Sequence, residues 1–308
     1  MEEYILRTNG LTKSYKGKQV LRGVSMNIRR GDVYGFVGEN GSGKTTVIRL
    51  ITGLIYPDSG DFTLFGANSN GSDISRARAR TGAVVEAPSI YLNMSAKDNL
   101  LMQSMILGIN DEEKCKYTLA TVGLGELWDN KKHAGDYSLG MRQRLGIAMA
   151  LLGDPEFLIL DEPMNGLDPA GIVDIRELIL SLNRERGITF LISSHILTEL
   201  ALVATKYGII SQGVILQEIS KEELDGVCRH TTQITATDST ALLNVLAPDF
   251  DNTRMFVING GVQIEGDIDL NAVLAKIISA GITITAVNTH RSSIEDYYLS
   301  MTGGYRRA

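Results

Sequence analysis

The stretch GENGSGKTT, from Gly38 to Thr46, carries residue types that together bind phosphate. It lies between the apolar runs VYGFV and VIRLITGL, which predict a buried strand before it and a helix after it. Glycines let backbone N–H groups turn inward around phosphate, while an ammonium at Lys44 and a hydroxyl at Thr45 suit the β/γ-phosphates and Mg²⁺. A chance glycine-rich turn does not explain the flanking strand and helix. The residues assigned to this nucleotide site are Gly38, Asn40, Gly41, Ser42, Gly43, Lys44, Thr45 and Thr46.

Two adjacent carboxylates, Asp161 and Glu162, end the apolar run FLILD and begin the next turn. In open α/β sheets, ligands bind beyond the carboxyl ends of the strands. Asp161 can therefore hold Mg²⁺ through water, while Glu162 polarises the water that attacks a phosphate. The alternative is a solvated acidic turn, which the phosphate-binding loop makes the weaker interpretation.

Apolar runs alternating with helical stretches predict the elements that position these groups. Besides FLILD, the runs ITFLISS and YGIIS read as strands buried on both faces, which is typical of a parallel sheet in an α/β fold. Before these runs, Ser95 with Asp98 resembles a capping box, and Asp111 opens a second helix that ends at Gly123. We expect a first domain over residues 1–219 with a helical insert at about 88–153.

The remaining residues, 220–308, predict a small α+β domain. Its expected order is strand, helix, strand, strand, helix, strand, which matches a split βαβ, ferredoxin-like unit. The predicted ranges are 231–237, 239–246, 255–259, 262–266, 270–280 and 282–287.

Composition limits the classes of function. The 308 residues are 44% hydrophobic and 21% charged, and no apolar run reaches the roughly 18 residues that span a bilayer. The start, MEEYILRTNG, lacks the positive n-region of a signal peptide, so we expect a cytoplasmic protein. A net charge of −6 argues against a nucleic-acid partner, because such binding depends on basic surfaces.

Three segments in this order resemble the nucleotide-binding domain of ABC transporters: GENGSGKTT, YSLGMRQRLGIAMALLGDPEFLILDEPMNGLDP and LISSH. The resemblance covers roughly the first 215 residues and implies a P-loop NTPase fold with a RecA-like core and a helical subdomain, with ATP and Mg²⁺ as ligands. It implies that Asp161 closes the metal-binding strand, Glu162 is the general base and His195 contacts the γ-phosphate. It further implies that Asp168 couples two sites and that Tyr15, in LTKSYKGKQVL, stacks on adenine. Taken alone, Tyr15 is better read as a strand aromatic, and His195 as a satisfied polar residue.

The chain departs from the family pattern at the signature, where YSLGM stands in place of LSGGQ. Ser138 and Gly140 keep their positions, and a capped helix N-terminus with inward N–H groups suffices for an anion. In the family this anion is the γ-phosphate on the opposite subunit. The resemblance therefore implies a head-to-tail homodimer with two ATP molecules between its subunits.

A second departure is Glu86 in GAVVEAPSIY, where the family usually has Gln. A carboxylate can reach Mg²⁺ as an amide does, although it adds a negative charge beside triphosphate. The alternative is a tolerated surface residue. Glu86, APSIY and the C-terminal extension resemble the motor subunits of exporters that protect bacteria against bacitracin and lantibiotics.

The resemblance implies a peripheral subunit on the cytoplasmic face of the membrane that hydrolyses ATP to drive a separate permease. A soluble ABC ATPase acting on ribosomes or DNA is the alternative, but such proteins tend to carry two nucleotide domains or a long coiled-coil insert. A regulator that has lost hydrolysis would lack a carboxylate, whereas Glu162 and His195 are both present.

Overall fold

The computed structural model describes residues 4–227, 230–250, 254–291, 297–298 and 301. Its contacts divide the chain into two compact units, Met1–Lys221 and Glu222–Ala308. The sequence places this boundary between residues 219 and 220. No helix in the described part of the chain is long and apolar enough to cross a membrane.

The first unit is built on a six-stranded sheet in the order β11-β10-β4-β9-β8-β7. All neighbouring pairs except β10 with β11 are parallel. Every residue of β4, β8 and β9 is buried, which confirms the strands predicted from their continuous apolar runs. The strands are β4 (Val33–Val37), β7 (Thr81–Val84), β8 (Phe157–Asp161), β9 (Thr189–Ser194), β10 (Lys206–Ser211) and β11 (Val214–Ser220).

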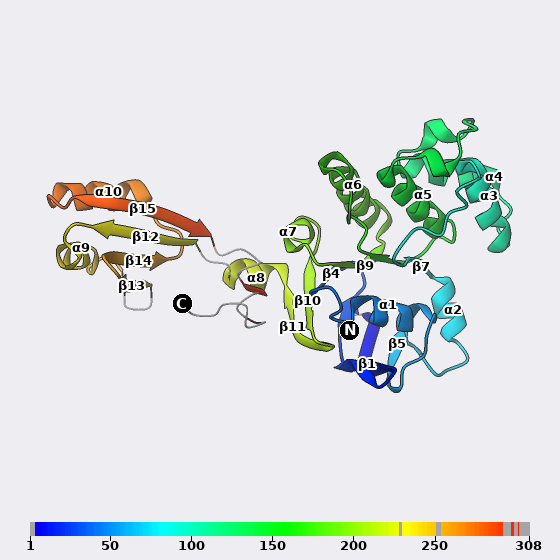
Figure 1. Cartoon of the computed structure of the whole chain (residues 1–308), viewed down its shortest axis with the longest axis horizontal. Coiled ribbons are helices and arrows are strands. Elements are labelled where there is room, and N and C mark those ends of the chain that lie inside the picture. The colour runs from blue at the N-terminus through cyan, green and yellow to red at the C-terminus, as the bar shows by residue number, and fades with distance from the viewer. Residues whose placement is uncertain (1–3, 228–229, 251–253, 292–296, 299–300, 302–308) are drawn as a thin grey trace. The chain divides into compact units, whose positions relative to one another are not determined.

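An antiparallel sheet lies on the other side of helix α1 (Lys44–Thr52) (Figure 1). Its order is β2-β1-β5-β6, and β3 pairs with β1. Buried apolar side chains from both sheets and from α1 form one core cluster, so the helix that follows the phosphate-binding loop is fixed on both sides. The strands are β1 (Tyr4–Tyr15), β2 (Lys18–Val24), β3 (Asn27–Arg29), β5 (Ser59–Leu64) and β6 (Ala67–Asn68).

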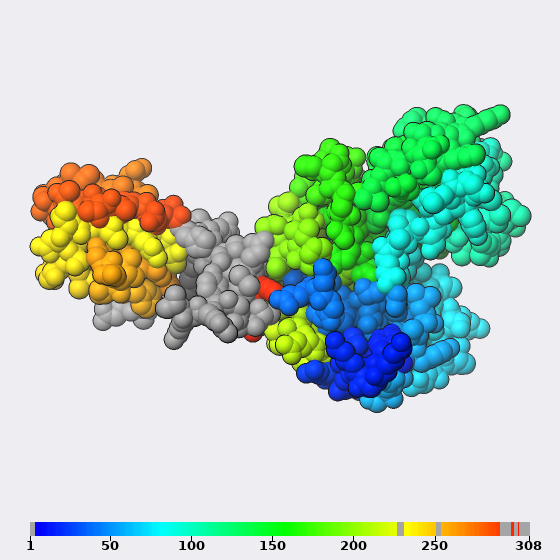
Figure 2. All heavy atoms as spheres, viewed as in Figure 1, coloured from blue at the N-terminus to red at the C-terminus, as the bar shows by residue number. Residues whose placement is uncertain are grey.

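The helical insert lies between β7 and β8 and forms a lobe beside the sheets, drawn in cyan to green (Figure 2). Its predicted helix starts are confirmed, because Ser95 accepts the Asp98 N–H and Asp111 accepts the Lys114 N–H. Its helices are α3 (Ala96–Ile106), α4 (Glu112–Thr121), η1 (Gly125–Leu127), η2 (Ala134–Asp136) and α5 (Leu139–Leu151). The other helices of the chain up to residue 227 are α2 (Ile74–Ala79), α6 (Pro169–Arg186), α7 (Leu197–Leu200) and α8 (Lys221–Val227).

The second unit has the predicted ferredoxin-like order of elements. Its antiparallel sheet is ordered β13-β14-β12-β15, so β14 lies between the two strands that α9 connects. Asp238 and Asp269 cap the two helices, whose apolar faces pack on one side of the sheet. The elements are β12 (His230–Ala236), α9 (Ser239–Leu246), β13 (Met255–Ile258), β14 (Gly261–Glu265), α10 (Leu270–Ser279) and β15 (Ile284–Arg291).

Candidate functional site

The carboxyl ends of three parallel strands bring the predicted catalytic residues to one edge of the sheet. Val37 of β4 pairs with Ser194 of β9, and Asp161 of β8 pairs with Ser193. Because the strands are parallel and adjacent, the loops that follow them emerge side by side. The phosphate-binding loop, the acidic pair and His195 are therefore neighbours in space although far apart in sequence.

The loop before α1 has the backbone of a phosphate cradle. Gly41 and Gly43 have φ values of 81° and 114°, which glycine adopts without strain. A Cβ at Gly38 would clash with the backbone oxygen of Ile210, so only glycine fits there. Ser42 Oγ is buried and has no hydrogen-bond partner among the described residues, as expected of a group that awaits a ligand.

A cavity of about 170 Å³ lies in front of this loop. Among the predicted site residues, Glu162 and several residues of the phosphate-binding loop line this cavity together. Val20 of β2 also lines it, although the sequence did not indicate this residue. The lining residues are Val20, Asn40, Gly41, Gly43, Lys44, Thr45, Thr46 and Glu162.

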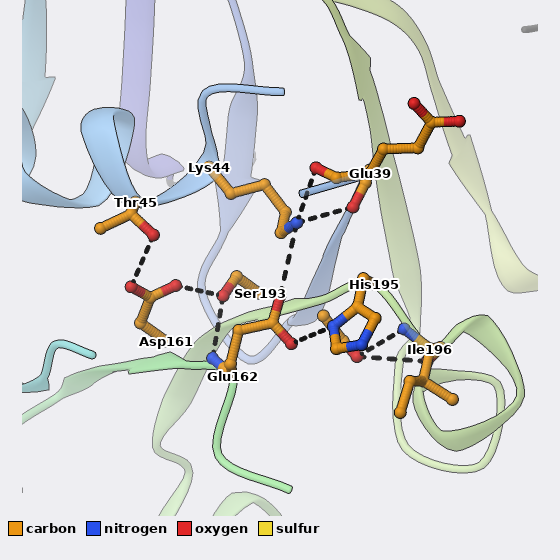
Figure 3. A network of polar contacts seen from close by, with 10 residues as sticks. Glu39, Lys44, Thr45, Asp161, Glu162, Ser193, His195 and Ile196 are labelled. Atoms are coloured by element: carbon orange, nitrogen blue, oxygen red, sulfur yellow. Dashed lines mark hydrogen bonds and ion pairs between the residues drawn. The ribbon is translucent and has the colours of Figure 1, made fainter. Parts of the chain in front are cut away.

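Lys44, Glu162 and His195 form a continuous polar network at the cavity (Figure 3). The Lys44 ammonium is buried and donates to the backbone oxygens of Gly38 and Glu39 at 2.6 and 3.2 Å. It also lies 3.3 Å from Glu162 Oε1, while Glu162 Oε2 lies 2.8 Å from His195 Nδ1. The carboxylate is thus held between a fixed cation and an imidazole.

Asp161 is buried and occupies the other side of the site. Its Oδ2 accepts the Thr45 hydroxyl at 2.9 Å, and its Oδ1 accepts the Ser193 hydroxyl at 2.5 Å. A carboxylate and a hydroxyl in contact beside a phosphate cradle are the hard oxygen donors that Mg²⁺ prefers, so these residues fit the ion.

The structure does not place Glu86 with this pair, contrary to its expected place at the metal. Its Oε1 lies 2.5 Å from Arg49 Nη2, and no described contact joins it to Thr45 or Asp161. The Glu86 side chain is more than half exposed and its backbone has a φ of 62°. Arg49 on α1 competes with a metal ion for the Glu86 carboxylate. The spacing of motifs in the sequence does not reveal this ion pair.

Tyr15 lies at the end of β1, in the hairpin that β1 forms with β2. Its side chain is exposed and it pairs with Lys18 across the turn. Val20 of the same hairpin lines the cavity. Tyr15 is therefore accessible to a ligand, on the hairpin that borders the phosphate-binding loop.

Ser138, Gly140 and Asp168 form a separate group. Ser138 caps α5 by accepting the Met141 N–H, and Asp168 caps α6 by accepting the Gly171 N–H. An added Cβ at Gly140 would lie 4.0 Å from Gly171 Cα, so the two helix N-termini are close together. None of the three lines the cavity of the phosphate-binding loop.

Two further side chains at the site were not singled out from the sequence. Ser193 donates to Asp161 and accepts the Glu162 N–H at 3.0 Å, a role that follows from strand register. Burial raises the pKa of Glu199, whose Oε2 has no hydrogen-bond partner in the described ranges; His195 and Glu162 also influence it electrostatically. The position of Glu199 four residues after His195 in LISSHILTEL is the only sequence signal for it.

Known proteins share this architecture. The sequence profile described as "ABC transporter" matches residues 21–165. The bacitracin transport ATP-binding protein BcrA of Bacillus licheniformis is 40% identical over 304 residues, which cover 97% of this chain and 98% of that protein. The lantibiotic transport ATP-binding protein SrtF of Streptococcus pyogenes is 41% identical over 222 residues, covering 72% of this chain and 92% of that one.

Among solved structures, that of cbiO1 from Clostridium perfringens, part of the ABC transporter complex cbiONQ, matches 73% of this chain and 92% of its own. The TM-score is 0.65 and the identity is 28%. The similarity over nearly the full length of BcrA and the fold of the first unit lead to the same conclusion. This chain belongs to the ABC transporter family and is an ATP-binding subunit with ATPase activity.

Proposed function

We propose that this chain is the motor that drives a separate membrane permease. The observation behind this proposal is the network of Lys44, Glu162 and His195. This network supports the proposal because it holds a cation, a carboxylate base and an imidazole in contact beside a phosphate cradle. Backbone N–H groups of Gly38–Thr46 and the Lys44 ammonium bind the triphosphate, and Tyr15 stacks on adenine. Thr45 and Asp161 hold Mg²⁺, which when bound neutralises charge on the transferred phosphoryl group.

The contacts of Lys44 suggest how binding leads to hydrolysis. Its ammonium lies 3.3 Å from Glu162, and phosphate oxygens compete for that cation. Once Lys44 turns to phosphate, Glu162 is free to accept a proton from water as the water oxygen attacks the γ-phosphorus. The bond from that phosphorus to the bridging oxygen breaks, leaving ADP and phosphate. His195 keeps the carboxylate oriented and contacts the γ-phosphate.

Two copies of the chain complete each site. Ser138 and Gly140 lie at the N-terminus of α5 and Asp168 at that of α6, apart from the cavity of their own chain. In a head-to-tail homodimer they face the γ-phosphate held by the opposite copy, where N–H groups and the positive helix end favour an anion.

The permease docks on the helical insert. Met105, Ile106 and Leu107, at the end of α3, are all exposed, and three consecutive large apolar side chains in water favour a protein contact. Docking there puts the chain on the cytoplasmic face of the membrane, where ATP is available. The names of BcrA and SrtF indicate a peptide antibiotic as the exported molecule.

Copurification tests the coupling to a permease. We expect tagged chain from detergent-solubilised native membranes to retain a multispanning membrane protein, and a variant with Met105, Ile106 and Leu107 changed to Asp to lose it. A matched control replaces Tyr56, an exposed aromatic outside the insert, by Asp. Recovery of ribosomes or DNA without any membrane protein would instead support the soluble ABC ATPase.

A further inference from the structure

The hairpin that carries Tyr15 contains a bulge next to the nucleotide cavity. Lys13 pairs with Leu21 but Ser14 pairs with Gln19, so Val20 has no partner in β1. A bulge bends a strand and redirects its side chains. Here the unpaired Val20 lines the cavity. The same strand packs on the phosphate-binding loop, because a Cβ at Gly43 would lie 2.6 Å from Leu21 Cδ2.

Asp58, in the turn before β5, binds β1 at this bulge. Its Oδ2 accepts the Ser14 N–H at 2.6 Å and its Oδ1 accepts the Lys13 ammonium at 2.9 Å. Its own N–H donates to the Thr12 oxygen at 2.9 Å. Hydrogen bonds from Lys13 and Ser14 hold the pKa of Asp58 below its usual range, so the group is ionised at neutral pH. One residue therefore fixes three consecutive positions just before Tyr15.

Lys13 extends this contact to the Tyr15 ring. The ammonium that Asp58 binds lies 5.9 Å from the ring centroid, within range of a cation–π interaction. Lys13 and Tyr15 are two residues apart on a strand, so they lie on one face of the sheet. The Tyr15 ring is held on this side, while 40% of the residue remains exposed.

We propose that Asp58 is a positioning residue for the nucleotide base: by holding the bulge in β1 and β2 it directs Tyr15 and Val20 toward the base and sugar of ATP. The inference rests on the proposed stacking of Tyr15 on adenine and adds a residue that acts through the hairpin without touching the ligand.

The test measures ATP affinity by displacement of a fluorescent ATP analogue from the full chain, with ATPase kinetics alongside. We expect Asp58→Ala to raise the Kd and KM for ATP about fivefold with kcat unchanged, because a misplaced ring loses binding and not chemistry. Asp58→Asn keeps an oxygen for the Ser14 N–H and should lose less. Inorganic tripolyphosphate, which has no base, should bind wild type and Asp58→Ala equally.

Two further variants separate the inference about Asp58 from the proposed adenine site. They are Tyr15→Ala and the double variant that combines Tyr15→Ala with Asp58→Ala. If Asp58 acts through Tyr15, Asp58→Ala should have little further effect in the Tyr15→Ala background. Asp61→Ala, three residues further on in β5, is the matched control. Should Tyr15→Ala weaken ATP binding while both Asp58 variants leave it unchanged, only the inference is overturned. Unchanged affinity in Tyr15→Ala refutes the adenine site and the inference with it. Equal weakening of tripolyphosphate overturns the positioning role and shows a general structural one.

Discussion

At the scale of single residues, Glu162 combines an unusual backbone with two fixed contacts. Its φ of 50° lies in the left-handed region, which costs a residue other than glycine on the order of 1 kcal/mol. Ser193 holds the Glu162 N–H through its hydroxyl and its carbonyl oxygen, at 3.0 and 3.1 Å. These hydrogen bonds hold the Glu162 backbone in its strained conformation and so fix the direction of the carboxylate, as a positioned base requires.

Replacing Glu162 by Gln removes this base and keeps the shape of the side chain. We expect ATP hydrolysis to fall at least about a hundredfold while ATP binding persists, so that the ATP-bound dimer accumulates. Size-exclusion chromatography with Mg-ATP and a phosphate-release assay measure the two effects. Glu185→Gln, on an exposed part of α6, is the control. Hydrolysis at the wild-type rate would remove Glu162 from the role of base.

Glu86 and Arg49 form a pair whose two members can be changed separately. Glu86→Gln keeps a side-chain oxygen for Arg49 and removes one charge, so we expect ATPase activity and antibiotic protection to survive. Glu86→Ala should lose protection more completely than basal hydrolysis, because it removes the link between α1 and the segment that leads into the helical insert.

The measurements are survival of cells carrying the permease under a peptide antibiotic and ATPase rates of the purified complex. Arg49→Gln breaks the same ion pair but keeps the Glu86 carboxylate, so it shows whether protection depends on the pair or on the carboxylate itself. Equal survival of wild type and Glu86→Ala at matched expression would return Glu86 to a tolerated surface position.

At the scale of elements, the sequence was sufficient where one pattern determines the structure. Strands β4, β8 and β9 are wholly buried and read as unbroken apolar runs. Ser95 and Asp111 mark the starts of α3 and α4, because each side chain accepts a capping hydrogen bond. Pairing between strands was not readable, since register depends on partners far away in the chain. The contact of Asp161 with Ser193 and the bulge at Val20 both follow from register. Likewise, no spacing rule indicates that Arg49 pairs with Glu86.

Glu156 joins three elements at the opposite edge of the main sheet. It precedes β8 and accepts hydrogen bonds from Arg80, which precedes β7, and from Arg30, which follows β3. These two guanidinium groups lower the pKa of Glu156 to about 2, from an ordinary value of 4.5. A lowered pKa stabilises the fold at pH values above 4.5, and this contribution is lost as the pH falls toward 2.

Glu156→Gln should therefore lower the free energy of unfolding at pH 7 by roughly 1 kcal/mol, a figure reduced for the partial exposure of all three side chains. Urea unfolding of the full chain at several pH values measures it. The gap between wild type and variant should narrow from pH 4.5 toward pH 2. A gap that stays constant over this range would show that ionisation of Glu156 does not stabilise the fold.

At the scale of the whole molecule, the site residues fall into two groups that one copy of the first unit keeps apart. The cavity of the phosphate-binding loop includes Lys44 and Glu162, whereas Ser138 and Asp168 cap α5 and α6 outside it. The N-terminus of α5, capped by the Ser138 hydroxyl, carries the partial positive charge of a helix end, which suits a phosphate supplied by a second copy. This separation makes sharing of sites between subunits testable by complementation.

A Lys44→Ala subunit and a Ser138→Ala subunit damage opposite halves of such a shared site. Each homodimer should be inactive, since both of its sites carry one defect. After mixing and verified exchange, about half of the dimers are mixed, and each has one site with both defects and one with neither. We expect about a quarter of wild-type ATPase activity to return if sites work singly. Exchange can be followed by energy transfer between subunits labelled at an introduced cysteine on the second unit. Mixed dimers that form yet remain inactive would mean either that each copy completes its own site or that both sites must hydrolyse ATP together. A covalently linked dimer with a single Lys44→Ala subunit separates these two cases. It stays inactive only if hydrolysis requires two intact sites.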